Sequence, residues 1–259
     1  MGSDPKHDPL AMLLRQFFLS TMAGCCAEYI GRAEAGNWGY RRFLLELCEV
    51  EAQHRLQSRI GRYLKESCLP PGKTLATLDE RLLPEKVRRQ LPTLLEGDFV
   101  GRAENLLCFG LPGRGKTHFL AALGRELVLR HHRRVLFVPT FKLVGRLLNA
   151  KRDGRLESAL RRLEIFDAVI LDDIGYVQQA RDEMEVLFTF LAECYERRSV
   201  MISSNLVFSQ WDQIFKDAMT TMAAIDRLVH HSTILEFAGD SHRARKAKDK
   251  AASDTKPKG

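Results

Sequence analysis

The sequence GLPGRGKT, from Gly110 to Thr117, decides how the rest of the chain is interpreted. It matches the pattern G-x-x-x-x-G-K-[ST], and it stands between an apolar run that ends at Phe109 and a helical pattern that begins at His118. Glycines let a backbone wrap closely around phosphate oxygens, and the N-terminus of the following helix adds the positive end of its dipole. The stretch therefore predicts a strand, a phosphate-binding loop and a helix, in that order.

The ligand expected in this loop is ATP with Mg²⁺. Lys116 would neutralise the β and γ phosphates, and the hydroxyl of Thr117 would bind the metal ion. The alternative, a glycine-rich turn without a ligand, is disfavoured by the strand and helix on either side. The residues expected to bind the nucleotide are Gly110, Pro112, Gly113, Arg114, Gly115, Lys116, Thr117 and His118.

Two further strand ends carry polar side chains. The apolar run from Ala168 to Leu171 stops at Asp172 and Asp173, and we expect Asp172 to hold Mg²⁺ and Asp173 to activate the attacking water. The run from Val200 to Ser203 is followed by Asn205, whose amide would orient that water if this strand lies between the other two. Taken alone, each feature is also typical of a turn or a helix cap.

Short apolar runs alternate with helical patterns after residue 100, which is typical of βαβ units. The fold class expected is α/β, with a parallel sheet flanked by helices. The candidate strands are Leu106 to Phe109, Val135 to Val138, Ala168 to Leu171, Val200 to Ser203 and Thr233 to Phe237.

The N-terminal part has a different texture, with helical spacing from Ala11 to about Ser67 that is interrupted around Asn37. Pro70 and Pro71 then prevent the helix from continuing. We expect a small all-α domain over residues 1–68, a linker over 69–100, a nucleotide-binding core over 101–241, and a basic tail over 242–259. The tail is either solvated or in nonspecific contact with DNA.

The composition limits the classes of partner. A formal net charge of +7 favours a polyanion, although charge alone does not establish nucleic-acid binding. The six cysteines lack the spacing of a zinc site, and the apolar stretch from Leu10 to Ile30 is too interrupted for a membrane span. We therefore expect a cytoplasmic protein that does not bind a membrane.

The ordered motifs resemble the DnaC/IstB branch of the AAA+ ATPases, and in particular the IstB-type ATP-binding proteins of insertion sequences. The resemblance covers most of the chain. The matching segments are the N-terminal helices, the linker with Pro70 and Pro71, the loop sequence at 110–120, Asp172 to Gly175, Ser203 to Asn205, Trp211 to Phe215, Asp226 to Leu228 and Gly239 to Arg243. It implies a P-loop AAA+ core with a reduced C-terminal lid.

Further roles are implied only by this resemblance: residues 1–68 would bind DNA or a partner, and residues 101–241 would form an AAA+ ATPase core. Asn205 resembles sensor I, Arg227 resembles an arginine finger offered to a neighbouring subunit, and Arg243 resembles sensor II. A finger acting in trans would make hydrolysis depend on assembly, because the transition-state charge is then fully countered only in an oligomer. The alternative for Arg227 is a surface salt bridge with Asp226 or Glu236.

The chain also departs from the family pattern. Arg114 and Ser203 each stand where a threonine is common, and His242 replaces a tyrosine. The last change puts the role of Arg243 in question. Asp173 is one methylene shorter than the usual glutamate, which puts its strength as a base in question.

The function implied by the resemblance is an ATPase that oligomerises on duplex DNA and assists a cognate transposase in target selection. Basic residues on a helix beginning near Thr140 are candidates for DNA contact, although they would equally suit a solvated helix face. These residues are Lys142, Arg146, Lys151 and Arg152. The alternatives are a replicative helicase loader of the DnaC type, a P-loop kinase for a small acceptor, and a DNA-binding protein with a degenerate nucleotide site.

Overall fold

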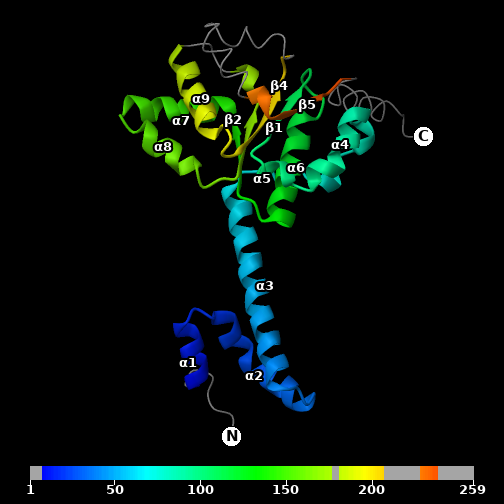
Figure 1. Ribbon diagram of the computed structural model, residues 1–259, viewed down its shortest axis with the longest axis vertical. Helices are drawn as coiled ribbons and strands as arrows, with labels where there is room; N and C mark the ends of the chain where they lie inside the picture. Colours follow the sequence, from blue (N-terminus) through cyan, green and yellow to red (C-terminus); the bar gives the residue numbers. More distant parts are fainter. Residues whose placement is uncertain (1–7, 177–180, 207–227, 239–259) are drawn as a thin grey trace, which may run out of the picture. The chain divides into compact units, whose positions relative to one another are not determined.

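The computed structural model describes residues 8–176, 181–206 and 228–238 (Figure 1). The chain divides into two compact units, residues 1–62 and residues 63–259, and each is described by itself. Within the described ranges, none of the helices combines the length and the apolar character that a membrane crossing requires.

The N-terminal unit is built from helices. They are α1 (Pro9–Gln16), α2 (Ser20–Ala35) and the greater part of α3 (Tyr40–Glu66). The side chain of Asp8 caps α1 and Pro9 occupies its first turn, which are favourable choices at a helix start. The predicted interruption around Asn37 is confirmed, since α2 ends at Ala35 and α3 begins at Tyr40.

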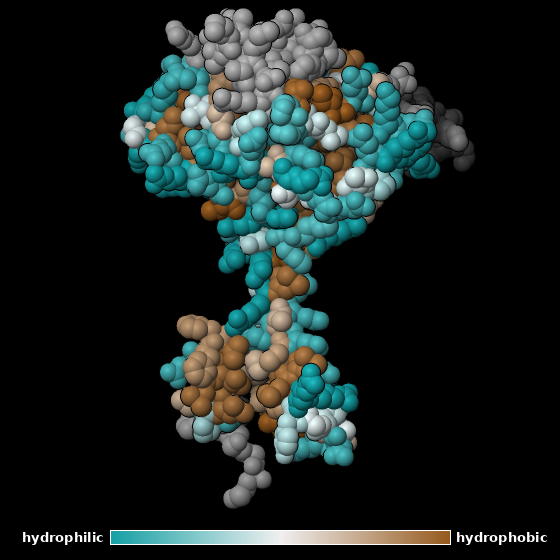
Figure 2. Space-filling model, in the orientation of Figure 1, coloured by the Kyte–Doolittle hydropathy of each residue, from teal (hydrophilic) through white to brown (hydrophobic). Residues whose placement is uncertain are grey.

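This unit has a small core and a large apolar surface. Met22, Cys26 and Leu47 form a buried cluster against which partly buried neighbours pack. Figure 2 shows brown, apolar surface over these helices. The large apolar side chains that stay exposed here are Leu10, Met12, Leu13, Phe17, Phe18, Ile30, Tyr40, Leu44 and Leu45.

A buried carboxylate ties α3 to the start of α2. The N-cap position of α2 is Leu19, which has no side-chain acceptor. Glu51 of α3 takes that role, because its Oε2 accepts hydrogen bonds from Thr21 N at 2.9 Å and Met22 N at 3.0 Å. Arg55 Nε donates to Glu51 Oε1 at 2.8 Å. Burial opposes ionisation of Glu51, but these hydrogen bonds outweigh it and lower the pKa of the carboxyl group.

The second unit contains a five-stranded parallel sheet in the order β2-β3-β4-β1-β5. The strand register aligns Leu171 with Ile202 and Ile202 with Leu107. Every residue of β1 is buried, as expected for a strand covered on both faces. The strands are β1 (Asn105–Phe109), β2 (Val135–Pro139), β3 (Ala168–Asp172), β4 (Ser199–Ser204) and β5 (Ser232–Glu236).

Helices cover both faces of this sheet, and Figure 1 shows α4 and α6 on one side and α7, α8 and α9 on the other. The apolar residues of α7, α8 and α9 share one core cluster with the strands. The helices are α4 (Glu85–Leu95), α6 (Lys116–His131), α7 (Thr140–Arg152), α8 (Leu156–Leu163) and α9 (Arg181–Cys194). The predicted α/β fold and the five predicted strands are confirmed.

The boundaries differ from those expected. The units separate between Arg62 and Tyr63 rather than at residue 68. The segment 69–100, expected as a linker, contains the 3-10 turns η1 (Leu75–Thr77) and η2 (Glu80–Leu82), then α4 and the short α5 (Asp98–Gly101). Val87 and Leu91 of α4 are buried. Pro70 and Pro71 follow the end of α3, but adjacent prolines do not stop the following chain from packing on the core.

Candidate functional site

Three adjacent strand ends bring the predicted polar residues to one edge of the sheet. β4 lies between β1 and β3, which is the arrangement that the prediction for Asn205 required. Because all three strands are parallel, the residues that follow them meet at the same edge. These residues are Gly110 after β1, Asp173 after β3 and Asn205 after β4.

One amide side chain joins the lysine of the loop to an aspartate. Lys116 Nζ donates to Asn205 Oδ1 at 2.9 Å, and also to the backbone oxygens of Gly110 at 2.6 Å and Leu111 at 3.0 Å. Asn205 Nδ2 donates to Asp173 Oδ1 at 2.8 Å and Oδ2 at 2.9 Å. The residues predicted to surround the terminal phosphate therefore form one connected network.

Ser203 holds both aspartates, a role that the sequence did not reveal. Its Oγ donates to Asp172 Oδ1 at 2.7 Å and accepts from Asp173 N at 2.8 Å. Asp173 has a left-handed backbone with φ 61°, which a residue with a side chain rarely adopts without support. The only signal in the sequence was a hydroxyl residue at the end of an apolar strand.

Burial shifts the pKa values of the charged pair in opposite directions. Burial lowers the pKa of Lys116, and Arg114 adds to this effect while Asp173 and Asp172 oppose it. Burial also raises the pKa of Asp173, and the like charge of Asp172 raises it further against the hydrogen bond from Asn205. A carboxylate with a raised pKa accepts a proton more readily, which suits a general base.

The loop has the backbone conformation that its glycines predict. Gly110, Gly113 and Gly115 have φ values of 144°, 81° and 89°. A Cβ at Gly110 would lie 2.4 Å from the backbone oxygen of Phe237, so glycine is required there on steric grounds as well. α6 begins at Lys116, which directs its N-terminal N–H groups into the loop.

The segment before α4 also reaches the loop. His118 Nε2 lies 3.1 Å from Thr77 Oγ1 and 3.1 Å from the backbone oxygen of Thr74. η1 thus lies beside the first turn of α6, the helix that directly follows the phosphate-binding loop. Nothing in the sequence pattern predicted this contact.

The residues present fit a nucleoside triphosphate. Arg114 Nε is buried without a hydrogen-bond partner among the described residues, and a phosphate oxygen would supply an acceptor. The oxygen donors of Thr117 and Asp172 are of the type that Mg²⁺ prefers. The described parts of the chain contain no group of three or more His, Cys, Asp or Glu side chains that could hold a metal by themselves.

The other predicted residues are placed as follows. Lys142, Arg146 and Arg152 are exposed on α7, whereas Lys151 Nζ forms an ion pair with Glu185 at 2.7 Å. The predicted arginines Arg227 and Arg243 lie outside the described residues.

α7 is also attached to the site at its first residue. The buried Thr140 donates a hydrogen bond from Oγ1 to the backbone oxygen of Asp172 at 3.1 Å.

Comparison with known proteins agrees with this geometry. The family model described as IstB-like ATP binding protein matches residues 12–251. A protein of Sinorhizobium fredii (strain NBRC 101917 / NGR234), named as an insertion sequence ATP-binding protein, is 40% identical over 239 residues, which are 92% of this chain and 80% of the relative. A protein of Pseudomonas aeruginosa, named as the ATP-binding protein of insertion sequence IS21, is 36% identical over 247 residues, which are 95% and 92% of the two chains.

Solved structures share the fold at low sequence identity. The crystal structure of DnaI has a TM-score of 0.55 at 21% identity and covers 66% of this chain and 95% of its own. The DnaC helicase loader has a TM-score of 0.51 at 16% identity, with coverage of 59% and 89%. AMPPCP-bound DnaA from Aquifex aeolicus has a TM-score of 0.54 at 19% identity, with coverage of 74% and 58%. The second unit thus has the AAA+ fold.

Proposed function

Because the chain belongs to the IstB-like ATP-binding proteins, we propose that it hydrolyses ATP with Mg²⁺, oligomerises on duplex DNA and assists a transposase in target selection. The observation that carries the proposal is the amide bridge, in which Asn205 contacts both Lys116 and Asp173. Nucleotide binding alone would not require a carboxylate that is joined to the lysine through an amide able to orient water. The names of the relatives, which refer to insertion sequences, support the transposition context.

The side chains of the loop and of the strand ends have separate roles in this reaction. Asp173 accepts the proton of the attacking water, and Asn205 orients that water. Lys116 and Arg114 counter the charge on the phosphate oxygens. Thr117 and Asp172 would hold Mg²⁺, which neutralises phosphate charge when bound.

Two arginines would complete the site. Arg227 acts as a finger on the nucleotide of a neighbouring subunit, and Arg243 contacts the nucleotide within its own subunit. Arg227→Ala is expected to lower turnover and to leave ATP binding intact. Mixing it with Lys116→Ala protein is expected to restore part of the activity, because some interfaces then combine an intact loop with an intact finger. If mixing restores nothing at any ratio, the finger does not act in trans.

Contact with DNA is assigned to α7. Lys142, Arg146 and Arg152 are exposed on this helix, whose buried residues face the core. Lys and Arg side chains on such a surface bind phosphates and release condensed counterions. Lys151 contributes less, because its charge is compensated by Glu185.

The proposal is tested with the purified chain, ATP, Mg²⁺, duplex DNA and the cognate transposase. We expect the rate of phosphate release per protein molecule to rise with protein concentration. We also expect assembly on DNA that requires ATP, and stimulation of strand transfer. Lys116→Ala is expected to remove all three. Strand transfer that is unchanged by the wild-type protein would contradict the assignment to transposition.

A second candidate is a replicative helicase loader, which is favoured by the fold shared with the DnaC helicase loader. This role uses the same nucleotide site with a different client. Parallel capture of the replicative helicase and of the transposase by the immobilised chain separates the two functions. Retention of the helicase alone would support the loader.

A further inference from the structure

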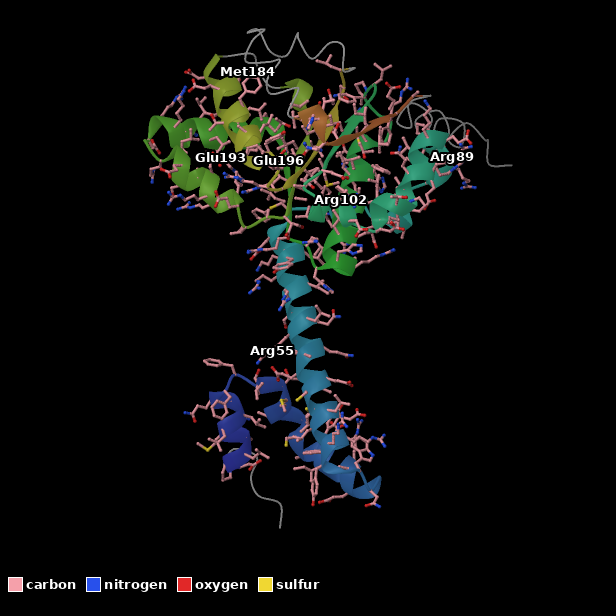
Figure 3. All side chains as sticks on the ribbon, viewed as in Figure 1. Arg55, Arg89, Arg102, Met184, Glu193 and Glu196 are labelled. Atoms are coloured by element: carbon pink, nitrogen blue, oxygen red, sulfur yellow. The ribbon has the colours of Figure 1, made fainter. Side chains whose placement is uncertain are left out.

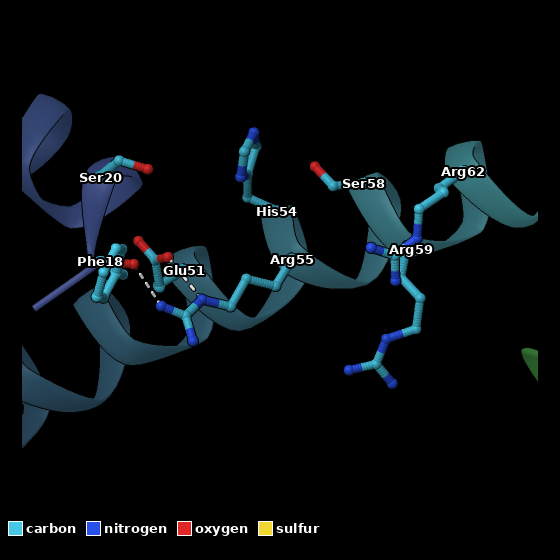
Figure 4. A pocket seen from close by; sticks show the side chains of 8 residues that line it. All are labelled: Phe18, Ser20, Glu51, His54, Arg55, Ser58, Arg59 and Arg62. Carbon is cyan, nitrogen blue, oxygen red and sulfur yellow. Dashed lines mark hydrogen bonds and ion pairs between the residues drawn. The ribbon is translucent and has the colours of Figure 1, made fainter.

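The N-terminal unit contains an open groove of about 450 Å³ that the nucleotide site does not use (Figure 4). Phe18 and Ser20, from the connection between α1 and α2 and the start of α2, line one part of it. The α3 side consists of Glu51, His54, Arg55, Ser58, Arg59 and Arg62. These six positions follow one another at intervals of three, one, three, one and three residues, which places them on one face of the helix.

The groove is lined by three arginines and one glutamate, so the α3 side carries more positive than negative side chains. The carboxylate of Glu51 is used by the N-terminus of α2 and by Arg55, whose Nη2 also donates to the backbone oxygen of Phe18. Arg55 projects from α3 in Figure 3. Arg59 has no carboxylate partner among the described residues, and it is exposed, as is Arg62. Two arginines therefore extend the face beyond the Glu51–Arg55 pair.

The dimensions of this face suit a nucleic-acid backbone. From Arg55 to Arg62 the helix rises about 10 Å, over which one strand of B-DNA carries about three phosphates. Ser20 and Ser58 add hydroxyl donors of the kind that contact phosphates. The α3 side of the groove presents only polar side chains, whereas the centre of a protein interface is apolar.

We propose that this groove binds the sugar–phosphate backbone of duplex DNA, with Arg59 and Arg62 as the principal phosphate ligands. The inference rests on the proposed function, because it supplies a second contact with the same DNA. Arg55 is a positioning residue, since its guanidinium holds the α1–α2 connection beside the groove. Phe18, 83% exposed at its edge, offers an apolar surface to the deoxyribose rings.

The test compares two double variants of the full chain. Arg59→Gln with Arg62→Gln removes two charges from the groove. Arg15→Gln with Arg41→Gln removes two exposed charges from the same unit outside the groove and serves as the matched control. Binding to a short fluorescent duplex is measured by anisotropy over a range of salt concentrations with ATP present.

The groove variant is expected to bind duplex DNA on the order of tenfold more weakly at physiological salt. Its plot of log affinity against log salt concentration is expected to be less steep by about 1.8, because each of the two lost phosphate contacts removes about 0.9 from the slope. The control variant is expected to retain the wild-type slope. Arg59→Lys with Arg62→Lys is expected to keep the slope, because a point charge still binds phosphate. ATP turnover without DNA, and the circular dichroism spectrum, are expected to remain unchanged in all variants.

Three results would overturn the inference alone. The first is equal duplex affinity and equal salt slope in the groove variant and the wild type. The second is a loss of affinity confined to single-stranded DNA or RNA. The third is a loss of the transposase response with unchanged DNA binding, which would assign the groove to an acidic protein surface. If the wild-type chain itself does not bind duplex DNA, the proposed function fails together with the inference.

Discussion

The two units of this chain are stabilised in different ways. In the second unit, strands buried on both faces carry the site residues at their ends, and one large apolar cluster joins the sheet to α7, α8 and α9. In the N-terminal unit the buried cluster consists of Met22, Cys26 and Leu47, and the polar Glu51 is buried as well. In the second unit, the site residues are positioned by an apolar core. In the N-terminal unit, the start of α2 is positioned by hydrogen bonds from its backbone to Glu51. The effects of substitution should differ accordingly.

The largest effect is expected from Asp173→Asn. Because Asn205 holds this side chain and the loop does not contact it directly, replacing its carboxylate removes the proton acceptor without removing the loop that binds ATP. Turnover should fall by about a hundredfold or more, while ATP binding persists. Phosphate release and nucleotide titration measure the two quantities. Asp153→Asn, at an exposed aspartate, is the control, and unchanged turnover in Asp173→Asn would remove this residue as the base.

Core truncations test the difference between the units directly. Leu107→Ala in β1 and Leu47→Ala in α3 each delete a buried leucine side chain and should cost about 2–5 kcal/mol of local stability. Leu107→Ala should also weaken ATP binding, because β1 leads into the loop. Leu47→Ala should leave ATP binding intact and increase hydrogen exchange in residues 9–62. Equal loss of ATP binding in both variants would show that the core of the N-terminal unit also supports nucleotide binding.

The polar cap of α2 should have a smaller effect. Glu51→Ala leaves Thr21 N and Met22 N without their acceptor and should cost about 1–2 kcal/mol, as the loss of an N-cap does. Glu49→Ala, an exposed glutamate of the same helix, is the control. Hydrogen exchange of α2 amides measures the difference, and equal protection in the two variants would show that the cap adds nothing.

The contribution of Glu51 should also depend on pH in a known direction. Its pKa is lower in the folded chain, so the unfolded chain binds the proton more tightly. The stabilisation is therefore fully present above the ordinary glutamate pKa of about 4.3 and is lost as the pH falls through the lower folded value. The stability difference between wild type and Glu51→Ala, measured by exchange at several pH values, should shrink on acidification. A stability difference that grows below this pH would show that folding does not lower the pKa of Glu51.

The smallest effect is expected from Ser203→Ala. Removing the hydroxyl frees Asp172 Oδ1 and Asp173 N, and turnover should fall by up to about tenfold because the aspartates are less well fixed. Ser199→Ala deletes another buried hydroxyl of β4, one that donates to Phe99 O. Both variants should lose similar stability in thermal unfolding, but only the first should lose turnover. Equal turnover would limit Ser203 to a structural role.

The sequence predicted the parts of the site that depend on local pattern. Motif spacing predicted the glycines of the loop. The rule that parallel strands end at one edge of the sheet predicted that the aspartates after β3 and Asn205 after β4 lie near this loop. The contacts of Ser203 and the approach of Thr77 to His118 depend on register and packing between distant segments, which spacing does not encode. For the same reason the packing of α4 was missed within residues 69–100. The roles of Arg227 and Arg243 stay predictions.

The ammonium group of Lys116 makes three hydrogen bonds within the chain. An ammonium group has three N–H donors, and here the three acceptors are Gly110 O, Leu111 O and Asn205 Oδ1. A phosphate oxygen can reach this group only by taking the place of one of them, so ATP binding is an exchange of partners. If the displaced acceptor is Asn205 Oδ1, the amide separates from Lys116 but stays hydrogen-bonded to Asp173. Binding of the nucleotide would then reposition Asp173, the proposed base.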